Sequence, residues 1–240
     1  MPALCPSLLG SALCQPVDIY CERISASFFA EPLNAVSNLA FMVAGWVAWR
    51  EFRQRSNPSS DPLLAAIVAV VPIVGLGSFA FHTLATRWAS WADVIPILIF
   101  MLLYIWLVMR RYFAWPRWLA STALLAFFLL TIFLEAGVPE QILWGGAMYL
   151  PTIAVFVAVA IAPNACSKEV RTTIAAAAAL FLLGFTFRTL DAPLCESLPI
   201  GTHYFWHVSN AVVLYLLIHA AILHGRTVAR YASAPVGIVR

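Results

Sequence analysis

Charged residues are scarce in this sequence. They make up 10% of the 240 residues, whereas hydrophobic residues make up 62%, and the mean hydropathy is +0.88. A soluble domain carries about 25% charged residues, so this composition indicates a protein whose solvent is lipid. The sequence has no basic run or basic tail, and its formal net charge is only +3. We therefore expect no nucleic-acid partner.

The short alternating segments of a β-sheet are also missing. The apolar stretches exceed the 4–8 residues of a buried strand, and several approach the roughly 20 residues that cross a hydrocarbon core as a helix. Backbone polar groups in lipid must pair within their own segment, which favours helices. The prediction is an all-α bundle of seven transmembrane helices, at about Leu33–Trp49, Pro62–Leu84, Trp88–Met109, Trp118–Leu134, Gln141–Ala162, Thr172–Phe187 and Thr202–Leu223.

The N-terminus lacks the basic start of a signal peptide. The segment Met1–Cys14 is apolar, and Pro2 and Pro6 interrupt it. We expect it to remain as a cap on the bundle rather than to be cleaved. The expected organisation is an outer N-terminal segment (1–32), a seven-helix membrane domain (33–224) and a cytoplasmic tail (225–240), with no second domain.

The basic residues alternate between the two sets of loops. Three of the fourteen, Arg23, Arg87 and Arg188, fall on one side. The other eleven fall on the opposite side, which the positive-inside rule assigns to the cytoplasm. An odd number of spans then places the N-terminus outside and the C-terminus in the cytoplasm. The eleven are Arg50, Arg53, Arg55, Arg110, Arg111, Arg117, Lys168, Arg171, Arg226, Arg230 and Arg240.

Polar residues gather at the outer ends of four predicted helices. Such residues are costly at membrane depth and usually face the bundle interior, so their shared level predicts a functional site there. This site would face the periplasm, the extracellular space or an organelle lumen. Its members are Glu31, Asn34, Ser37, Asn38, Ser78, His82, Asp93, His203 and His207.

Three histidines in this group have the spacing of metal ligands. His203 and His207 are four residues apart and therefore share a helical face, and His82 ends the second span. Three neutral imidazoles suit tetrahedral zinc and leave one position open for water, as in catalytic sites. Zinc would lower the pKa of that water toward about 7. Taken singly, each histidine has an alternative role as an interhelical hydrogen-bonding residue.

Three other residues are candidates for catalysis or substrate binding. Asp93 can reach the same place and act as general base and acid, and Ser78 can orient the water or stabilise an oxyanion. The alternatives are a structural ion pair of Asp93 with Arg87 and a small residue, Ser78, at a helix crossing. Tyr149 is a candidate to point its hydroxyl at a substrate, with packing as the alternative.

The pattern Ser78-x3-His82-x10-Asp93, followed by His203-x3-His207, resembles the signature of the alkaline ceramidases. These belong to a superfamily of seven-helix membrane hydrolases that includes the adiponectin and progestin receptors. The segment from Tyr20-Cys21-Glu22 to Ser37-Asn38 is similar to the ceramidase N-terminus. The resemblance implies a zinc-dependent hydrolase of a lipid amide, with the three histidines as ligands and Asp93 and Ser78 as helpers.

The resemblance also implies calcium beside the zinc, held by Asp18, Glu22 and Glu31, because hard oxygen ligands suit calcium. The stretch between Glu22 and Glu31 departs from the family's pattern. It is shorter, and the expected asparagine is absent, with Arg23, Ile24 and Ser25 in this region. Solvated acids and a helix N-cap region are the alternative reading.

Four of the five cysteines lie on the predicted outer side, where disulfides are permitted. These four are Cys5, Cys14, Cys21 and Cys195, whereas Cys166 faces the cytoplasm. We expect the pair Cys21–Cys195, because both lie within a few residues of the helices that carry the site. Sequence alone does not establish the connectivity.

The functional prediction is a zinc-dependent membrane hydrolase of linear amides whose substrate is a membrane lipid such as ceramide. Two alternatives remain. One is a receptor-like or channel-like protein with a structural zinc, and the other is a hydrolase of a different lipid, an ester or a GPI-type lipid.

Overall fold

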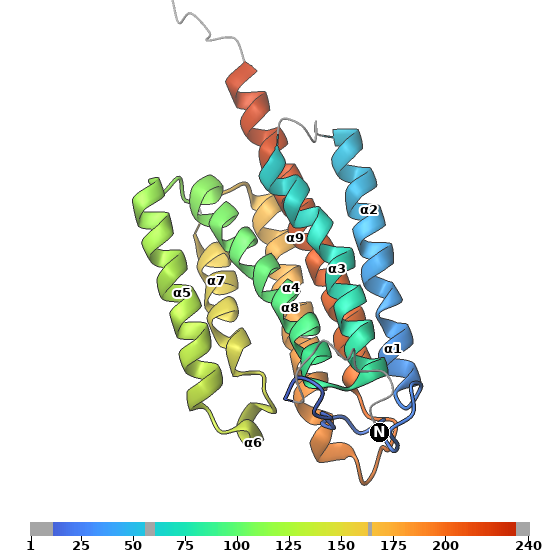
Figure 1. Cartoon of the computed structure of the whole chain (residues 1–240). Coiled ribbons are helices and arrows are strands. Elements are labelled where there is room, and N and C mark those ends of the chain that lie inside the picture. Colours follow the sequence, from blue (N-terminus) through green and yellow to red (C-terminus); the bar gives the residue numbers. More distant parts are fainter. Residues whose placement is uncertain (1–11, 56–60, 163–164, 234–240) are drawn as a thin grey trace, which may run out of the picture.

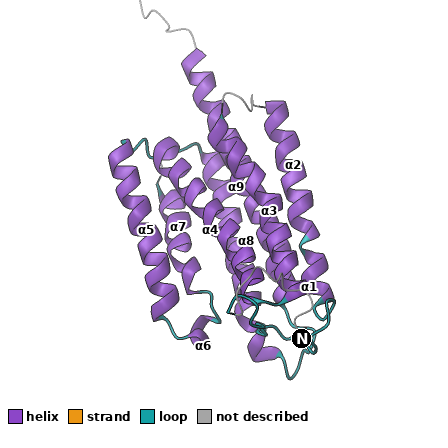
Figure 2. Cartoon of the chain, in the orientation of Figure 1, coloured by secondary structure: helices purple, strands orange, loops and turns teal. Residues whose placement is uncertain are grey.

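The computed structural model describes residues 12–55, 61–162 and 165–233. Their regular structure is helical apart from one β-bridge between Pro16 and Thr86, and the long helices form a bundle (Figures 1 and 2). The helical elements are α1 (Pro32–Ser37), α2 (Leu39–Arg55), α3 (Pro62–Leu84), α4 (Arg87–Leu107), the π-helical η1 (Val108–Tyr112), α5 (Arg117–Gly137), α6 (Glu140–Leu143), the 3-10 turn η2 (Ala147–Tyr149), α7 (Leu150–Ile161), α8 (Lys168–Leu190), the 3-10 turn η3 (Ala192–Leu194) and α9 (His203–Ser233).

Local sequence signals begin two of the long helices. Asp61 caps α3 by accepting a hydrogen bond from the Leu64 amide at 3.0 Å, and proline occupies the first helical position. Ser167 caps α8 in the same way, through the Val170 amide at 3.3 Å. A side-chain acceptor before a helix satisfies an amide that lacks an intrahelical partner. Proline at the first helical position has no amide N–H that needs a partner.

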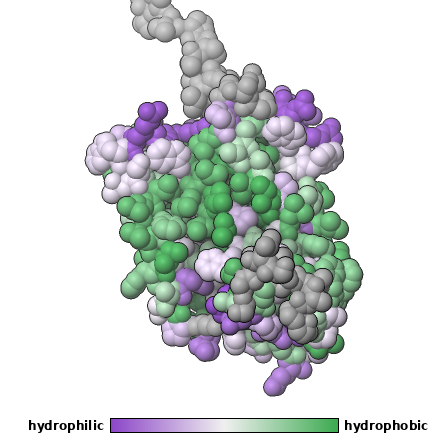
Figure 3. Space-filling model, in the orientation of Figure 1, coloured by the Kyte–Doolittle hydropathy of each residue, from purple (hydrophilic) through white to green (hydrophobic). Residues whose placement is uncertain are grey.

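Within the part of the chain that the structure describes, five helices are long and apolar enough to cross a membrane: Pro62–Leu84, Arg87–Tyr112, Arg117–Gly137, Lys168–Leu190 and His203–Gly225. On the face shown in Figure 3, apolar residues form a belt across the middle of the bundle, and hydrophilic residues collect at both ends. Large apolar side chains of the long helices, such as Phe133 and Leu76, are exposed. An aqueous solvent would make such a surface unfavourable, so the chain is a membrane protein.

The first predicted span differs in detail from the structure. The helix is interrupted at Asn38, between α1 and α2, and then continues to Arg55 instead of ending at Trp49. Ser37 and Asn38 both donate side-chain hydrogen bonds to the Asn34 carbonyl, at 2.9 and 2.8 Å. Such side-chain bonds to the preceding turn compete with the helical ladder, which explains the interruption.

The fifth predicted span, Gln141–Ala162, is wrong as a single helix. The structure contains α6, an irregular stretch, η2 and the twelve-residue α7. Trp144 and Gly145 have positive φ values of 49° and 71°, which ends the helix. Arg188 binds the carbonyls of Leu143, Trp144 and Gly145 at 3.3, 2.8 and 3.0 Å, so the backbone acceptors remain paired without a helix.

The long helix α9 is the most buried of the five. It packs against α8, α2 and α3, and Ile218 and Ile222 on it are fully buried. Its first residue is His203, so the bundle's central helix begins at the expected functional site. We call this end of the bundle, where α3 ends and α9 begins, the histidine end.

Parts of two predicted segments fall outside the described residues. These parts are residues 1–11 of the expected cap Met1–Cys14 and residues 234–240 of the expected tail 225–240.

Candidate metal centre

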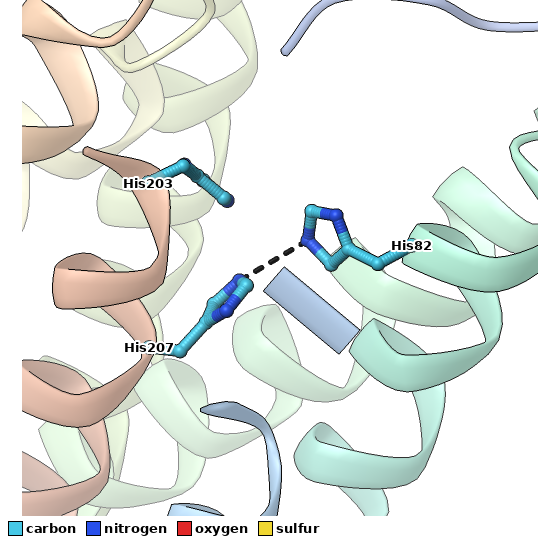
Figure 4. Close-up of side chains that lie close together, drawn as sticks. All are labelled: His82, His203 and His207. Carbon is cyan, nitrogen blue, oxygen red and sulfur yellow. Dashed lines mark hydrogen bonds between the residues drawn. The ribbon is translucent and has the colours of Figure 1, made fainter. Parts of the chain in front are cut away.

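The histidine end brings together His82, His203 and His207. One potential ligand atom from each lies within 4.8 Å of the others, and the three rings point toward one another (Figure 4). They are 0%, 2% and 3% exposed. Among the described residues this is the only group of three or more metal-binding side chains with such spacing.

The hydrogen-bond partners leave two imidazole lone pairs facing each other. His82 Nδ1 contacts a Glu31 carboxylate oxygen at 2.6 Å, so this nitrogen carries the proton. Ser37 gives its hydroxyl proton to Asn34 and therefore accepts from His207 Nδ1, at 2.8 Å. The two Nε2 atoms are then both acceptors, only 3.1 Å apart (Figure 4). A shared cation would relieve this repulsion, so the residues fit a metal ion.

His203 completes the donor set. Its Nδ1 is buried, and no hydrogen-bond partner for it exists among the described atoms. Burial of an unpaired imidazole nitrogen is unfavourable, and metal coordination would remove this cost. Tyr20 stacks on its ring at a centroid distance of 3.8 Å, which restricts how the imidazole can rotate.

Glu31 orients His82. Burial alone would raise the pKa of its carboxyl group, but the hydrogen bond and charge of His82, together with Arg23 and Asn34, hold this pKa below its ordinary value. The group is therefore a carboxylate. A carboxylate on the second nitrogen of a histidine sets its tautomer and ring orientation.

Asp191 builds the start of α9. Its Oδ1 accepts the amides of Thr202 and His203 at 2.6 and 2.9 Å, which lack partners at a helix N-terminus. Gly201 has φ of +65°, and a Cβ there would clash with the same carboxylate. Sequence reasoning did not identify Asp191. The available signal was an acidic residue, Asp191, and a glycine, Gly201, in the segment just before the predicted start of the seventh span.

Asp93 and Ser78 lie beside the histidines, on α4 and α3. Ser78 Oγ is 3.4 Å from His207 Nε2, and both Ser78 and Asp93 line the cavity described below. A glycine permits this arrangement, because a Cβ on Gly77 would clash with the Ala92 carbonyl oxygen. The close contact of α3 and α4 thus places residue 93 next to residue 78.

A cavity of about 430 Å³ opens next to the histidines. His203, His207, Ser78 and Asp93 line its polar part together with the charged residues Glu135 and Arg188, and Tyr149 also lines it. Tyr149 is 5% exposed, so the sequence candidate reaches the site and also packs in the core. Most of the wall is apolar and includes Phe100, Met101, Ile132, Trp206 and Leu214. This composition suits a ligand with a polar part and a hydrocarbon chain.

The calcium prediction receives no support. Asp18 is exposed, and the two oxygens of Glu22 accept the Leu33 and Asn34 amides at 2.6 and 2.8 Å. Both oxygens of Glu31 are likewise occupied, by Arg23 on one side and His82 on the other. Calcium takes 6–8 oxygen ligands, and these oxygens face N–H donors, so the residues do not fit this ion.

The structure contains a disulfide between Cys21 and Cys195, the pair expected from the sequence, with a Cα–Cα distance of 5.0 Å. It joins the N-terminal segment to the loop between α8 and α9. Cys166 is free.

These features define a membrane protein with a buried three-histidine site that could bind a metal ion beside an apolar cavity. A model of the Ceramidase family matches residues 18–233, most of the chain, and the chain therefore belongs to the Ceramidase family. No match was found among curated proteins. Membership supports a hydrolase acting on the amide bond of ceramide, and thus a lipid substrate.

Proposed function

We propose that this protein is a zinc-dependent hydrolase that cleaves ceramide within the membrane into a sphingoid base and a fatty acid. The observation that carries the proposal is the convergence of three buried histidines on one point at the polar end of an apolar cavity. Family membership supports ceramide as the substrate. The histidines alone support a metal ion, and their all-nitrogen donor set favours zinc.

His82, His203 and His207 would hold the zinc. When bound, zinc polarises a carbonyl group and lowers the pKa of a water molecule. The chain's own residues would supply the remaining chemistry. Glu31 and Ser37 keep the imidazoles of His82 and His207 turned toward the centre through their Nδ1 contacts.

Asp93 would move the proton. As a carboxylate it accepts a proton from the attacking water, and it then delivers this proton to the departing amine nitrogen. Ser78, with its hydroxyl near His207, would donate to the oxygen on which negative charge develops. Tyr149 would contact the substrate from the cavity wall.

The proposed topology has seven spans. Two further spans would complete the five long helices. These are α1–α2 as the first span and the broken α6–α7 segment as the fifth. The helix ends, loops and terminal segments then carry eleven basic residues on one side and three on the other, which favours an outer N-terminus and a cytoplasmic C-terminus. In this arrangement residues 1–32 are outer, 33–224 form the membrane domain and 225–240 are cytoplasmic, and the histidine end faces outward.

The test separates metal binding from chemistry. Purified protein should contain one zinc per chain by elemental mass spectrometry and should release fatty acid from ceramide. Asp93→Asn should keep the zinc but lose about 10²–10⁴-fold in kcat/KM, the usual range for a general acid–base.

Other outcomes identify the alternatives. One zinc per chain without any hydrolysis by the wild-type protein would indicate a structural metal, as in a receptor-like protein. Hydrolysis of ester or GPI-type lipids in preference to ceramide would change the substrate. Full activity of Asp93→Asn would remove Asp93 from the chemistry.

A further inference from the structure

The segment Tyr20–Arg23 crosses the histidine end, and each of its residues is attached to a different element. Tyr20 stacks on a ring of α9, Cys21 is joined to the loop before α9, and Glu22 accepts two amides of α1. Arg23 is attached to α3 and to the residue before α1. The segment therefore links the helices that carry the histidines.

Arg23 makes three interactions from one guanidinium group. Its Nε donates to Glu31 Oε1 at 2.5 Å, Nη1 donates to the Ser25 carbonyl at 3.3 Å, and Nη2 donates to the His82 carbonyl at 3.1 Å. Its side chain is only 5% exposed. A surface ion pair would contribute little, but burial reduces the screening of this one by water and salt.

The guanidinium holds both the backbone and the side chain of His82. The His82 carbonyl lies in the last turn of α3, where carbonyls lack intrahelical partners and the helix dipole favours a cation. The side chain is held through Glu31, whose second oxygen contacts His82 Nδ1 at 2.6 Å. One fixed cation thus acts on His82 by two routes.

We propose that Arg23 is a positioning residue whose guanidinium serves as a built-in cation beside Glu31, so that the metal centre is held in place without calcium. The donors of Arg23 and His82 face the Glu31 oxygens that would otherwise attract a divalent ion. Arginine is always charged and presents its donors in a fixed plane, which suits a permanent structural role. The proposal rests on the proposed zinc at the three histidines but not on ceramide as the substrate.

The first experiment concerns calcium. Purified wild-type protein is treated with a calcium-selective chelator, and its zinc content, its melting temperature in detergent and its ceramide hydrolysis are measured before and after calcium is restored. We expect no change in any of the three. A fall in zinc content or melting temperature that calcium reverses would overturn the proposal.

The second experiment compares three variants by zinc affinity in a chelator competition. Arg23→Gln removes the positive charge and the planar set of guanidinium donors. It should weaken zinc binding by about 10–100-fold, the usual effect of losing a residue that hydrogen-bonds to a metal ligand. Arg23→Lys keeps the charge but loses the planar set of donors, so its zinc affinity should fall between those of Arg23→Gln and wild type. Arg87→Gln changes an exposed arginine at the same end and should bind zinc like wild type.

Chemical rescue separates positioning from general destabilisation. In Arg23→Ala, added guanidinium ion at concentrations below those that unfold the protein should restore part of the zinc affinity, whereas it should not affect Arg87→Gln. If Arg23→Gln does not fold, Arg23→Lys and the rescue decide the question. Wild-type zinc affinity in Arg23→Gln or in Arg23→Ala would overturn the proposal. A protein that binds zinc but does not cleave ceramide would refute the proposed function and leave the Arg23 comparison intact.

Discussion

Two histidines on the same helix have different surroundings and should behave differently when they are replaced. His207 is 3% exposed and lies among the other two histidines. His219 lies twelve residues further along α9, roughly 18 Å by helical rise, and contacts Glu51 at 2.7 Å. This pair makes His219 a matched control for a ligand substitution.

His207→Ala should lose both stoichiometric zinc and ceramide hydrolysis, because two imidazoles bind the ion far less tightly than three. His219→Ala should retain the zinc, since its partner is a carboxylate at the other end of the bundle. Elemental analysis of both purified variants checks this prediction. One zinc per chain in His207→Ala would show that the ligand assignment is wrong.

The sequence predicted the grouping of the histidines because helical spacing and depth are local properties. His203 and His207 share a face, and His82 ends a helix at the same level. The supporting contacts were not predictable in this way. Asp191 accepts the Cys21 amide and Arg188 donates to the Trp144 carbonyl, both far away in the sequence, and the sequence indicates their charge but not their partners. For the same reason, the pairing of Glu51 with His219 was missed.

Among the helices, the contact of α3 with α4 determines where Asp93, the proposed acid–base residue, lies relative to the histidines. The histidines lie on α3 and α9, whereas Asp93 lies on α4. A side chain at Gly77 would push α4 away from α3 through the Ala92 carbonyl. We therefore expect that one added methyl group at residue 77 would separate the proposed metal binding from the proposed catalysis.

Gly77→Ala should keep its zinc but lose activity by about tenfold or more, because small displacements of a catalytic group are costly. Gly137→Ala is the control, since a Cβ there meets nothing within 4 Å, and its activity should match that of wild type. Zinc content and kcat/KM are measured for both. Equal activity in the two variants would contradict this role for the helix contact.

Helix bounds were predictable where capping signals and hydrophobic length agree. The predicted second span, Pro62–Leu84, coincides with α3, whose start has both a cap and a proline. The fifth span failed because hydrophobicity continues through Trp144 and Gly145 although the helix does not. The cause is the tertiary contact with Arg188, although the adjacent pair Gly145 and Gly146 was a local warning.

For the molecule as a whole, the position of the cavity indicates how a lipid reaches the centre. Some residues line the cavity and are also exposed on the outside of the bundle. Trp91 and Ile95 on α4 are 57% and 45% exposed, and Ile132 on α5 is 50% exposed. Only three residues of α5 are buried. We therefore expect ceramide to enter sideways from the bilayer, between α4 and α5.

We expect lateral entry because of the energetics of the proposed lipid substrate. Moving a lipid chain into water costs about 0.8 kcal/mol per methylene, so a path through the aqueous phase would be prohibitive for two long chains. Between α4 and α5 the chains stay in hydrocarbon while the amide approaches the histidines. A short-chain, water-soluble amide has no such advantage and should be a poor substrate.

Ile132→Trp should obstruct this path. We expect the KM for long-chain ceramide to rise on the order of tenfold, equivalent to about 1.4 kcal/mol, with little change for a short-chain analogue. Ile73→Trp is the matched control, because Ile73 is also 50% exposed but lies on α3 away from the cavity wall. Kinetics of both variants in vesicles, with both substrates, make the comparison. Equal effects of the two substitutions on long-chain ceramide would place the entrance elsewhere, and efficient cleavage of the short-chain analogue by wild-type protein would remove the need for a lateral path.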